Sequence, residues 1–195
     1  AKDKLLESIN GKSAVLIGPG ISTQQETIDL LIAIIPEIKV PILIDADGLN
    51  CLAEHLDVLR KAKGQVIITP HPGEMARLTR KTVKEVQANR IGIAEKFAAD
   101  YNVIVVLKGT GTIIASPDGI SFINTTGNAG MATAGTGDVL AGMAAGLLAQ
   151  KVTPPNASKA AVYLHGLAGD RVSQEKGEIS LIASDLIEVI PSILK

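Results

Sequence analysis

The sequence has one cysteine, no tryptophan, and only two tyrosines and two phenylalanines among its 195 residues. One cysteine cannot form a disulfide within the chain, and we expect Cys51 to pack between helices in a reducing, cytoplasmic compartment. So few aromatic side chains leave almost no platforms on which nucleic-acid bases could stack. Nineteen basic residues against twenty acidic ones give a net charge of −1, and no hydrophobic run reaches the length of about 20 residues that a membrane-spanning helix needs. We therefore expect neither a nucleic-acid partner nor a membrane.

Short apolar runs alternate with segments of helical periodicity over the first half of the chain, which is typical of an α/β fold with a parallel sheet. The expected strands are residues 13–18, 40–45, 65–69 and 103–108. The expected helices are residues 22–36, 49–63, 82–100, 137–150, 156–172 and 183–194. Ser22 or Thr23 should cap the first of these, and Thr82-x-x-Glu85 forms a capping box for the third.

The pattern changes after the fourth strand. Residues 112–116 and 120–124 flank Pro117-Asp118-Gly119, which predicts a β-hairpin rather than a helical crossover. The sequence contains no internal repeat and no linker-like segment. We expect a single domain over residues 1–195.

The most distinctive segment is residues 128–150, where Gly130, Gly135 and Gly137 precede Asp138 and an uncharged helical run. A glycine-rich turn that leads into a helix exposes backbone N–H groups at the positive end of the helix dipole, which favours an anion. The segment thus predicts a phosphate-binding loop with Asp138 as a catalytic base. The alternative is a tightly packed helix start with Asp138 as its cap.

Polar residues also gather at the carboxyl ends of the four expected strands. These clusters are residues 18–20, 45–50, 71–74 and 108–112. Ligands of open α/β sheets bind at this edge. We therefore expect the four clusters and the glycine turn to converge on one site.

Some side chains in these clusters have a functional and a structural interpretation. Asp45 and Asp47 suit a Mg²⁺ site or a substrate hydroxyl, or they form a turn and cap the next helix. His71 lies between two prolines, which favours a ligand contact in an exposed loop, whereas the helix dipole alone would explain Glu74. Lys108 ends a buried strand, where a lysine is costly unless it meets an anion or an acid, so we expect it to contact phosphate.

Other familiar sites are missing from the sequence. No set of His, Cys and acidic residues has zinc spacing, and no serine lies in a nucleophile elbow. The glycines match neither a Walker loop nor a dinucleotide fingerprint. Two histidines lie on helices among apolar neighbours and receive no functional role: His55 and His165.

Five motifs occur in a characteristic order along nearly the whole chain. They are Gly18-Pro-Gly20, Asp45-Ala-Asp-Gly-Leu-Asn50, Thr69-Pro-His-Pro-Gly-Glu-Met-Ala-Arg-Leu78, Leu107-Lys-Gly-Thr-Gly-Thr112 and Gly127-Asn-x-Gly-Met-Ala-Thr-x-Gly-Thr-Gly-Asp138. Together they resemble the ADP- or ATP-dependent NAD(P)H-hydrate dehydratases, a branch of the ribokinase-like superfamily. The last motif is highly specific in combination with the third. The resemblance implies a ribokinase-like, three-layer αβα fold with a mostly parallel central sheet flanked by helices.

The resemblance also implies an activity, in which ADP or ATP with Mg²⁺ drives dehydration of the S-epimer of NAD(P)H-hydrate back to NAD(P)H. The ring hydroxyl is phosphorylated and phosphate is then eliminated, with Asp138 as base and Glu74 linked to Mg²⁺ through water or phosphate. The implied substrate contacts are Gly20, His71, Pro72, Gly73, Glu74, Arg77 and Asp138. The implied nucleotide contacts are Lys108, Gly109, Thr110, Gly111, Thr112, Asn128, Gly130, Gly135, Thr136 and Gly137.

The chain departs from the family at its start, because family members carry further residues before the strand at 13–18. By resemblance, those residues supply additional strands, and without them the apolar edge of the sheet is open to aggregation or pairing. We therefore expect another segment or chain to supply them. The resemblance also implies a homotetramer.

Two alternatives remain. A kinase of the same fold, acting on a vitamin precursor or a sugar, suits the glycine turn and Asp138 equally well, and only the segment His71-Pro-Gly-Glu-Met-Ala-Arg77 favours the dehydratase. The second alternative is a nucleotide-binding or assembly module without turnover. It would bind ADP and leave the hydrate unchanged even when the sheet is completed.

Overall fold

A six-stranded sheet forms the centre of the protein in the computed structural model, which describes residues 1–194. Its strands lie in chain order: β1 (Val15–Ile17), β2 (Ile42–Ile44), β3 (Val66–Ile68), β4 (Val103–Leu107), β5 (Ile113–Ala115) and β6 (Ser121–Ile123). Strands β1 to β4 are parallel, and β4, β5 and β6 pair antiparallel. The predicted parallel strands and the predicted hairpin are confirmed.

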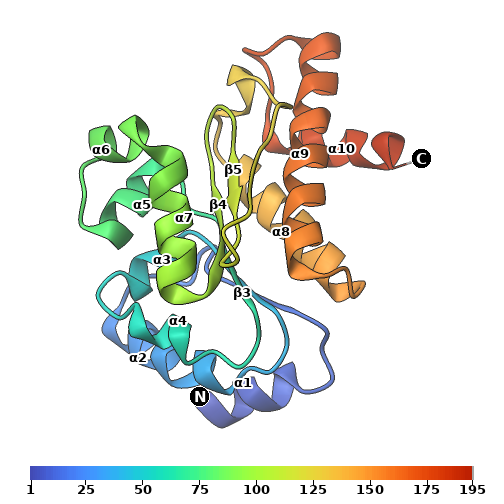
Figure 1. The fold of residues 1–195 in the computed structure, drawn as a ribbon. Helices are drawn as coiled ribbons and strands as arrows, with labels where there is room; N and C mark the ends of the chain where they lie inside the picture. The colour runs from blue at the N-terminus through green and yellow to red at the C-terminus, as the bar shows by residue number, and fades with distance from the viewer. Residues whose placement is uncertain (195) are drawn as a thin grey trace.

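Helices cover both faces of this sheet (Figure 1). The helices are α1 (Lys2–Ile9), α2 (Gln25–Ile34), α3 (Asp47–Leu52), α4 (Asp57–Arg60), α5 (Pro72–Thr79), α6 (Val83–Ala88), α7 (Arg90–Tyr101), α8 (Thr136–Ala149), α9 (Pro154–Lys176) and α10 (Ala183–Ile193), with 3₁₀ turns η1 (Ile35–Glu37) and η2 (Ala129–Met131). Helices α2 to α7 pack on one face and α8 and α9 on the other, with α10 against α9. This is the expected three-layer arrangement. Within the described residues, none of these helices has both the length and the apolarity needed to cross a membrane.

Strands β2 to β5 each contribute to two hydrophobic cores, because successive strand residues point to opposite faces. In β2, Ile42 and Ile44 join the core beneath α2 to α7, while Leu43 joins the core beneath α8 and α9. All three side chains are fully buried. Burial on both faces explains why the parallel strands read as continuous apolar runs rather than alternating ones.

Two predicted helices are each divided in the structure. The segment expected as one helix over 49–63 forms α3 and α4, and the segment over 82–100 forms α6 and α7. The second break occurs at Asn89, whose side-chain oxygen accepts a hydrogen bond from the Gly92 N–H at 3.2 Å and so starts a new helix. The capping box at the start of α6 is confirmed, since Thr82 and Glu85 bond reciprocally.

The start of α2 also differs from the prediction. Its N-cap is Gln24, and neither Ser22 nor Thr23 caps it. Ser22 instead adopts a left-handed conformation with φ +68°, from which its N–H donates to Asp47 Oδ2 at 3.1 Å. A contact with the next strand end therefore overrides the local capping preference. Helix α1 was not predicted, and none of its side chains is buried.

Candidate functional site

The ends of β1 and β2 touch directly. Gly18 has φ +137°, and a Cβ atom there would lie 1.7 Å from the carbonyl oxygen of Asp45. Only glycine can occupy this position, because any side chain would collide with the backbone of β2. The adjoining Gly20 is exposed with φ +72° and open space around its Cα. The loop with the predicted substrate contact Gly20 is thus fixed beside Asp45 and Asp47.

Lys108 links three of the strand ends that the sequence predicted to converge. Its ammonium nitrogen lies 2.8 Å from Asp45 Oδ1 and 3.9 Å from Glu74 Oε2. The Asp45 and Glu74 side chains are 2% and 6% exposed, and that of Lys108 is 19% exposed. The lysine at the end of a buried strand therefore meets acids, which was one of the two outcomes expected. Its predicted contact with phosphate stays a prediction.

His71 and Glu74 form a capping box at the start of α5. The His71 Nδ1 accepts hydrogen bonds from the N–H groups of Gly73 at 3.0 Å and Glu74 at 3.2 Å, which fixes the proton on Nε2 when the ring is neutral. The Glu74 Oε2 accepts from the His71 N–H at 2.7 Å, and Oε1 lies 3.5 Å from His71 Nε2. The protein thus holds Oε2 of Glu74, whereas Oε1 makes no hydrogen bond within residues 1–194. Pro72 is the first residue of this helix, where a missing N–H costs nothing.

Arg77 lies one turn further along α5. Its side chain is exposed and donates a hydrogen bond to Asn50 Oδ1 from α3. It therefore joins the helix that follows β2 to the helix that follows β3. Arg77 and Glu74 thus lie on the same helix, which begins after the end of β3.

The glycine turn forms the start of α8, as predicted. Gly135 is the N-cap with φ +86°, and a Cβ atom on Gly137 would lie 3.4 Å from the ammonium nitrogen of Lys108. The Thr136 hydroxyl donates to the carbonyls of Met131 and Thr133, which closes the turn. The N-terminal end of α8, where backbone N–H groups favour an anion, therefore lies beside a cation.

Asp138 occupies the first turn of α8 and is exposed. Since Gly135 is the N-cap and α8 has no side-chain cap, Asp138 does not cap the helix. Its carboxylate makes no ion pair with any side chain in residues 1–194. An exposed carboxylate without a protein partner can accept a proton from a bound ligand.

His165, a buried residue of α9, forms a hydrogen bond with the first turn of α8. Its Nε2 lies 2.9 Å from the carbonyl oxygen of Thr136 and must donate the hydrogen bond, because a carbonyl only accepts. Burial lowers the pKa of His165 to about 4, the Thr136 carbonyl opposes this shift, and the charge of Lys108 adds to it. The imidazole is therefore neutral near pH 7. Sequence reasoning assigned His165 no role, although it shares the buried face of α9 with Ala161 and Ala168.

The first part of the glycine turn contacts α9 rather than Lys108 and its acidic partners. The Asn128 amide donates to Asp170 Oδ1 at 3.1 Å, and its oxygen accepts from the Gly130 N–H. A Cβ atom on Gly130 would lie 2.5 Å from the carbonyl oxygen of Glu178. Close packing alone thus accounts for this glycine. The predicted nucleotide contacts of Asn128 and Gly130 stay predictions.

The loop over residues 108–112 is held by Arg90, the first residue of α7. The guanidinium donates to the carbonyls of Leu107 at 3.1 Å, Lys108 at 3.3 Å and Thr110. Burial lowers the pKa of Arg90. Sequence reasoning missed this residue. The sequence carried no signal for it, because the helix expected over 82–100 places Arg90 in its interior rather than at a helix start.

The loop also relies on two glycines in left-handed conformations. Gly109 has φ +135° and Gly111 has φ +63°. The Thr112 hydroxyl donates to the Gly109 carbonyl at 3.0 Å and closes the turn between them. The backbone of this segment is therefore sharply folded around the Arg90 guanidinium.

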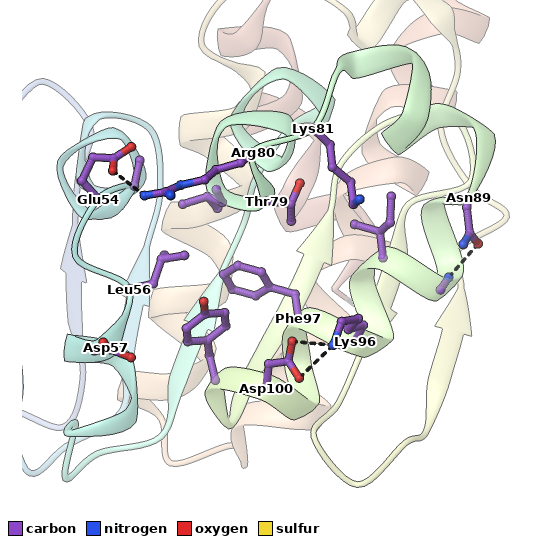
Figure 2. A pocket seen from close by; sticks show the side chains of 15 residues that line it. Glu54, Leu56, Asp57, Thr79, Arg80, Lys81, Asn89, Lys96, Phe97 and Asp100 are labelled. Carbon is purple, nitrogen blue, oxygen red and sulfur yellow. Dashed lines mark hydrogen bonds and ion pairs between the residues drawn. The ribbon is translucent and has the colours of Figure 1, made fainter.

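A cavity of about 730 Å³ lies away from these residues, between α3 and α4 on one side and α5 and α7 on the other. Most of the charged side chains in its wall are paired, and Figure 2 shows Arg80 with Glu54 and Lys96 with Asp100. None of the predicted site residues lines it. The cavity is therefore separate from the candidate site.

Metal binding by protein side chains alone finds no support in the geometry. Within residues 1–194, no group of three or more His, Cys, Asp or Glu side chains is placed to hold a metal ion. Glu74 Oε2 accepts from the His71 N–H, and Asp45 is paired with Lys108. The residues present do not form a Mg²⁺ site by themselves.

Comparison with known proteins gives a consistent result. A family model described as NAD(P)H-hydrate dehydratase matches residues 1–192. The chain is 45% identical over 195 residues to the bifunctional NAD(P)H-hydrate repair enzyme Nnr of Moorella thermoacetica, covering 100% of this chain and 37% of that protein. The chain thus spans little more than a third of this relative's length.

Solved structures confirm the fold. The ADP/ATP-dependent NAD(P)H-hydrate dehydratase from Bacillus subtilis, co-crystallised with ATP and Mg²⁺, superposes with a TM-score of 0.84 at 34% identity, covering 96% of this chain and 68% of that one. A ribokinase-like superfamily protein from Enterococcus faecalis superposes with a TM-score of 0.82 at 29% identity, covering 98% and 66%. The expected ribokinase-like architecture is therefore correct.

Proposed function

Because the chain belongs to the NAD(P)H-hydrate dehydratase family, we propose that it uses ADP or ATP to dehydrate the S-epimer of NAD(P)H-hydrate back to NAD(P)H. The observation that carries this proposal is the start of α8. There an exposed carboxylate, Asp138, follows Gly137, and the ammonium group of Lys108 lies against that glycine. A proton acceptor thus lies next to a site suited to phosphate, as phosphorylation of a hydroxyl requires.

In the first step, the hydroxyl oxygen on the nicotinamide ring attacks the terminal phosphorus of the nucleotide. Asp138 takes the hydroxyl proton as the new O–P bond forms and the bond to the leaving nucleotide breaks. The N–H groups at the start of α8 and the Lys108 ammonium stabilise the charge on the transferred group. Asp45 and Glu74 hold that ammonium in position.

In the second step, the lone pair of the ring nitrogen expels phosphate by breaking the C–O bond. Loss of a proton from the neighbouring ring carbon then restores the dihydronicotinamide. Phosphate is a far better leaving group than hydroxide, which is why the reaction consumes a nucleotide. Gly20, His71, Pro72, Gly73, Glu74 and Arg77 form the substrate side of the site in this proposal.

Mg²⁺ would enter with the nucleotide, since this ion is usually held by substrate phosphates and water with few protein ligands. The engagement of Glu74 by His71 and Lys108 supports a contact through water or phosphate rather than a direct bond. Lys108 to Thr112 and the turn from Asn128 to Gly137 form the nucleotide side. The B. subtilis structure with ATP and Mg²⁺ supports this choice of ligands.

We further propose that a segment outside residues 1–195, or another chain, pairs with the free edge of β1. This strand is at the end of the sheet, and Leu16 is 36% exposed. We also propose a homotetramer, which the family resemblance alone supports, and a cytoplasmic location, which the single cysteine supports. These proposals do not concern the site itself.

The test mixes the purified protein with NADH-hydrate, Mg²⁺ and either ADP or ATP, and follows the near-ultraviolet absorbance of NADH. We expect absorbance to recover only with nucleotide, and an ¹⁸O label in the hydrate hydroxyl to appear in the released phosphate. Release of the label into water instead of phosphate would contradict the phosphorylation step. Phosphorylation of an added vitamin precursor or sugar, without turnover of the hydrate, would favour the kinase alternative.

A further inference from the structure

One side chain, that of Arg90, binds backbone carbonyl groups at the start of the loop from Lys108 to Thr112. Arg90 donates to the carbonyl oxygens of Leu107, Lys108 and Thr110. A side chain at position 109 would crowd this contact, because a Cβ atom on Gly109 would lie 3.0 Å from Arg90 Nη2. The guanidinium is therefore packed against the back of the loop.

The orientation of the carbonyls fixes the orientation of the loop N–H groups. In a trans peptide the C=O of one residue and the N–H of the next point in opposite directions, and residues 1–194 contain no cis peptide bond. Since the Lys108 and Thr110 carbonyls face Arg90, the N–H groups of Gly109 and Gly111 face away from it. Neither of these N–H groups donates to a backbone carbonyl anywhere in residues 1–194.

The position of Arg90 is unfavourable for its own helix. It is the first residue of α7, where the dipole disfavours a cation, and its buried Nε has no hydrogen-bond partner in the part of the chain that the structure describes. Three carbonyl contacts offset this cost, and only the planar fork of arginine can reach all three. A lysine would supply the charge without the fork.

We infer that Arg90 is a positioning residue that turns the N–H groups of Gly109 and Gly111 outward to receive the phosphates of a nucleotide. The inference deepens the proposed function and rests on it, since the loop is the proposed nucleotide side of the site. Arg90 contacts the carbonyl side of the loop, and the nucleotide would contact the opposite, N–H side. Replacing Arg90 should therefore weaken binding of the nucleotide and leave binding of the hydrate unchanged.

The test compares Arg90→Met and Arg90→Lys with Arg60→Met in the full-length protein. Arg60 is a matched control, because its helix α4 covers the same face of the sheet as α7 (Figure 1). Its guanidinium donates to one backbone carbonyl, that of Asp100, and makes no hydrogen bond or ion pair with the loop 108–112 in the part of the chain that the structure describes. Calorimetric titration with ADP gives the dissociation constant, and steady-state kinetics give separate KM values for nucleotide and hydrate. Thermal unfolding reports whether each variant folds.

We expect Arg90→Met to weaken ADP binding by about tenfold to hundredfold, the effect of losing one or two well-placed donors. The KM for nucleotide should rise while the KM for the hydrate stays within about twofold, and Arg90→Lys should recover only part of the loss. If Arg90→Met fails to fold, Arg90→Lys decides the question by the same comparison.

Several results separate this inference from the proposed function. A folded Arg90 variant that binds ADP like Arg60→Met, or that raises both KM values equally, would overturn the inference while the dehydratase proposal stands. If wild-type protein binds ADP and the Arg90 variants bind it more weakly, but wild-type protein never dehydrates the hydrate, only the proposed function is overturned. Wild-type protein that binds no ADP would overturn both.

Discussion

His165 should make the protein less stable as the pH falls through the range of an ordinary histidine. Burial lowers the pKa of His165 from 6.5 to about 4 in the folded protein. Between these values the unfolded chain binds the proton and the folded chain does not, so the free energy of unfolding rises with pH in this window. The stability is fully present above pH 6.5 and is lost progressively as the pH falls toward 4.

The size of the loss follows from the two pKa values. Between pH 7 and pH 5 this residue alone should lower the free energy of unfolding by about 2 kcal/mol, and below pH 4 by about 3 kcal/mol. Protonation adds a proton at Nδ1 and leaves the Nε2–H bond to the Thr136 carbonyl in place, so the loss comes from the cost of burying the charged ring.

Urea denaturation at pH 7 and pH 5 measures this effect. In His165→Gln the side-chain amide can still donate to Thr136 but cannot titrate. The fall in the free energy of unfolding from pH 7 to pH 5 should therefore be about 2 kcal/mol smaller in this variant than in wild type. His55→Gln is the control, since His55 is exposed and its replacement should leave the wild-type pH dependence unchanged. An equal loss of stability in wild type and His165→Gln would refute the argument.

Two further substitutions test the contacts that hold the strand ends together. Gly18→Ala should lower the free energy of unfolding by about 3 kcal/mol or more, because its methyl group would lie 1.7 Å from the Asp45 carbonyl oxygen. Gly11→Ala, at φ +76° in open space, should cost about 1 kcal/mol; equal values in urea denaturation would be evidence against the close contact. Lys108→Met should cost about 3–5 kcal/mol by leaving the buried Asp45 carboxylate without its partner. Adding Asp45→Asn should restore part of that loss, and simple additivity of the two changes would contradict a direct ion pair.

The elements that the sequence predicted correctly are those specified by neighbouring residues. The hairpin around Pro117-Asp118-Gly119 and the capping box of Thr82 and Glu85 each depend on side chains a few positions apart. The buried strands depend on the apolar character of their own residues. These predictions hold because tertiary packing favours the same local structures that the neighbouring residues favour.

The features that the sequence could not predict depend on residues that folding brings together. Asp45 and Lys108 are 63 positions apart, and only the register of β2, β3 and β4 places them in contact. The same is true of His165 and Thr136, which are 29 positions apart. The break at Asn89 was missed because a helical period continues through it, while its side chain competes for the Gly92 N–H.

Within the candidate site, the sequence predicted which residues lie close together where they share a strand end or the start of a helix. His71, Glu74, Lys108 and Gly137 meet at the same edge of the sheet, as parallel strands require. Arg90 supports the site from the opposite side of the loop, and no short motif identifies a residue that acts only through backbone carbonyls. Tertiary geometry alone reveals it.

The central claim is that Asp138 accepts the proton of the ring hydroxyl during phosphoryl transfer. The most direct measurement is the rate of nucleotide-dependent NADH recovery by Asp138→Asn, with its affinity for ADP measured alongside. We expect the rate to fall by at least about a hundredfold, the usual contribution of a general base, while ADP binds with near wild-type affinity. Dehydration by Asp138→Asn at a rate close to that of wild type would contradict the account.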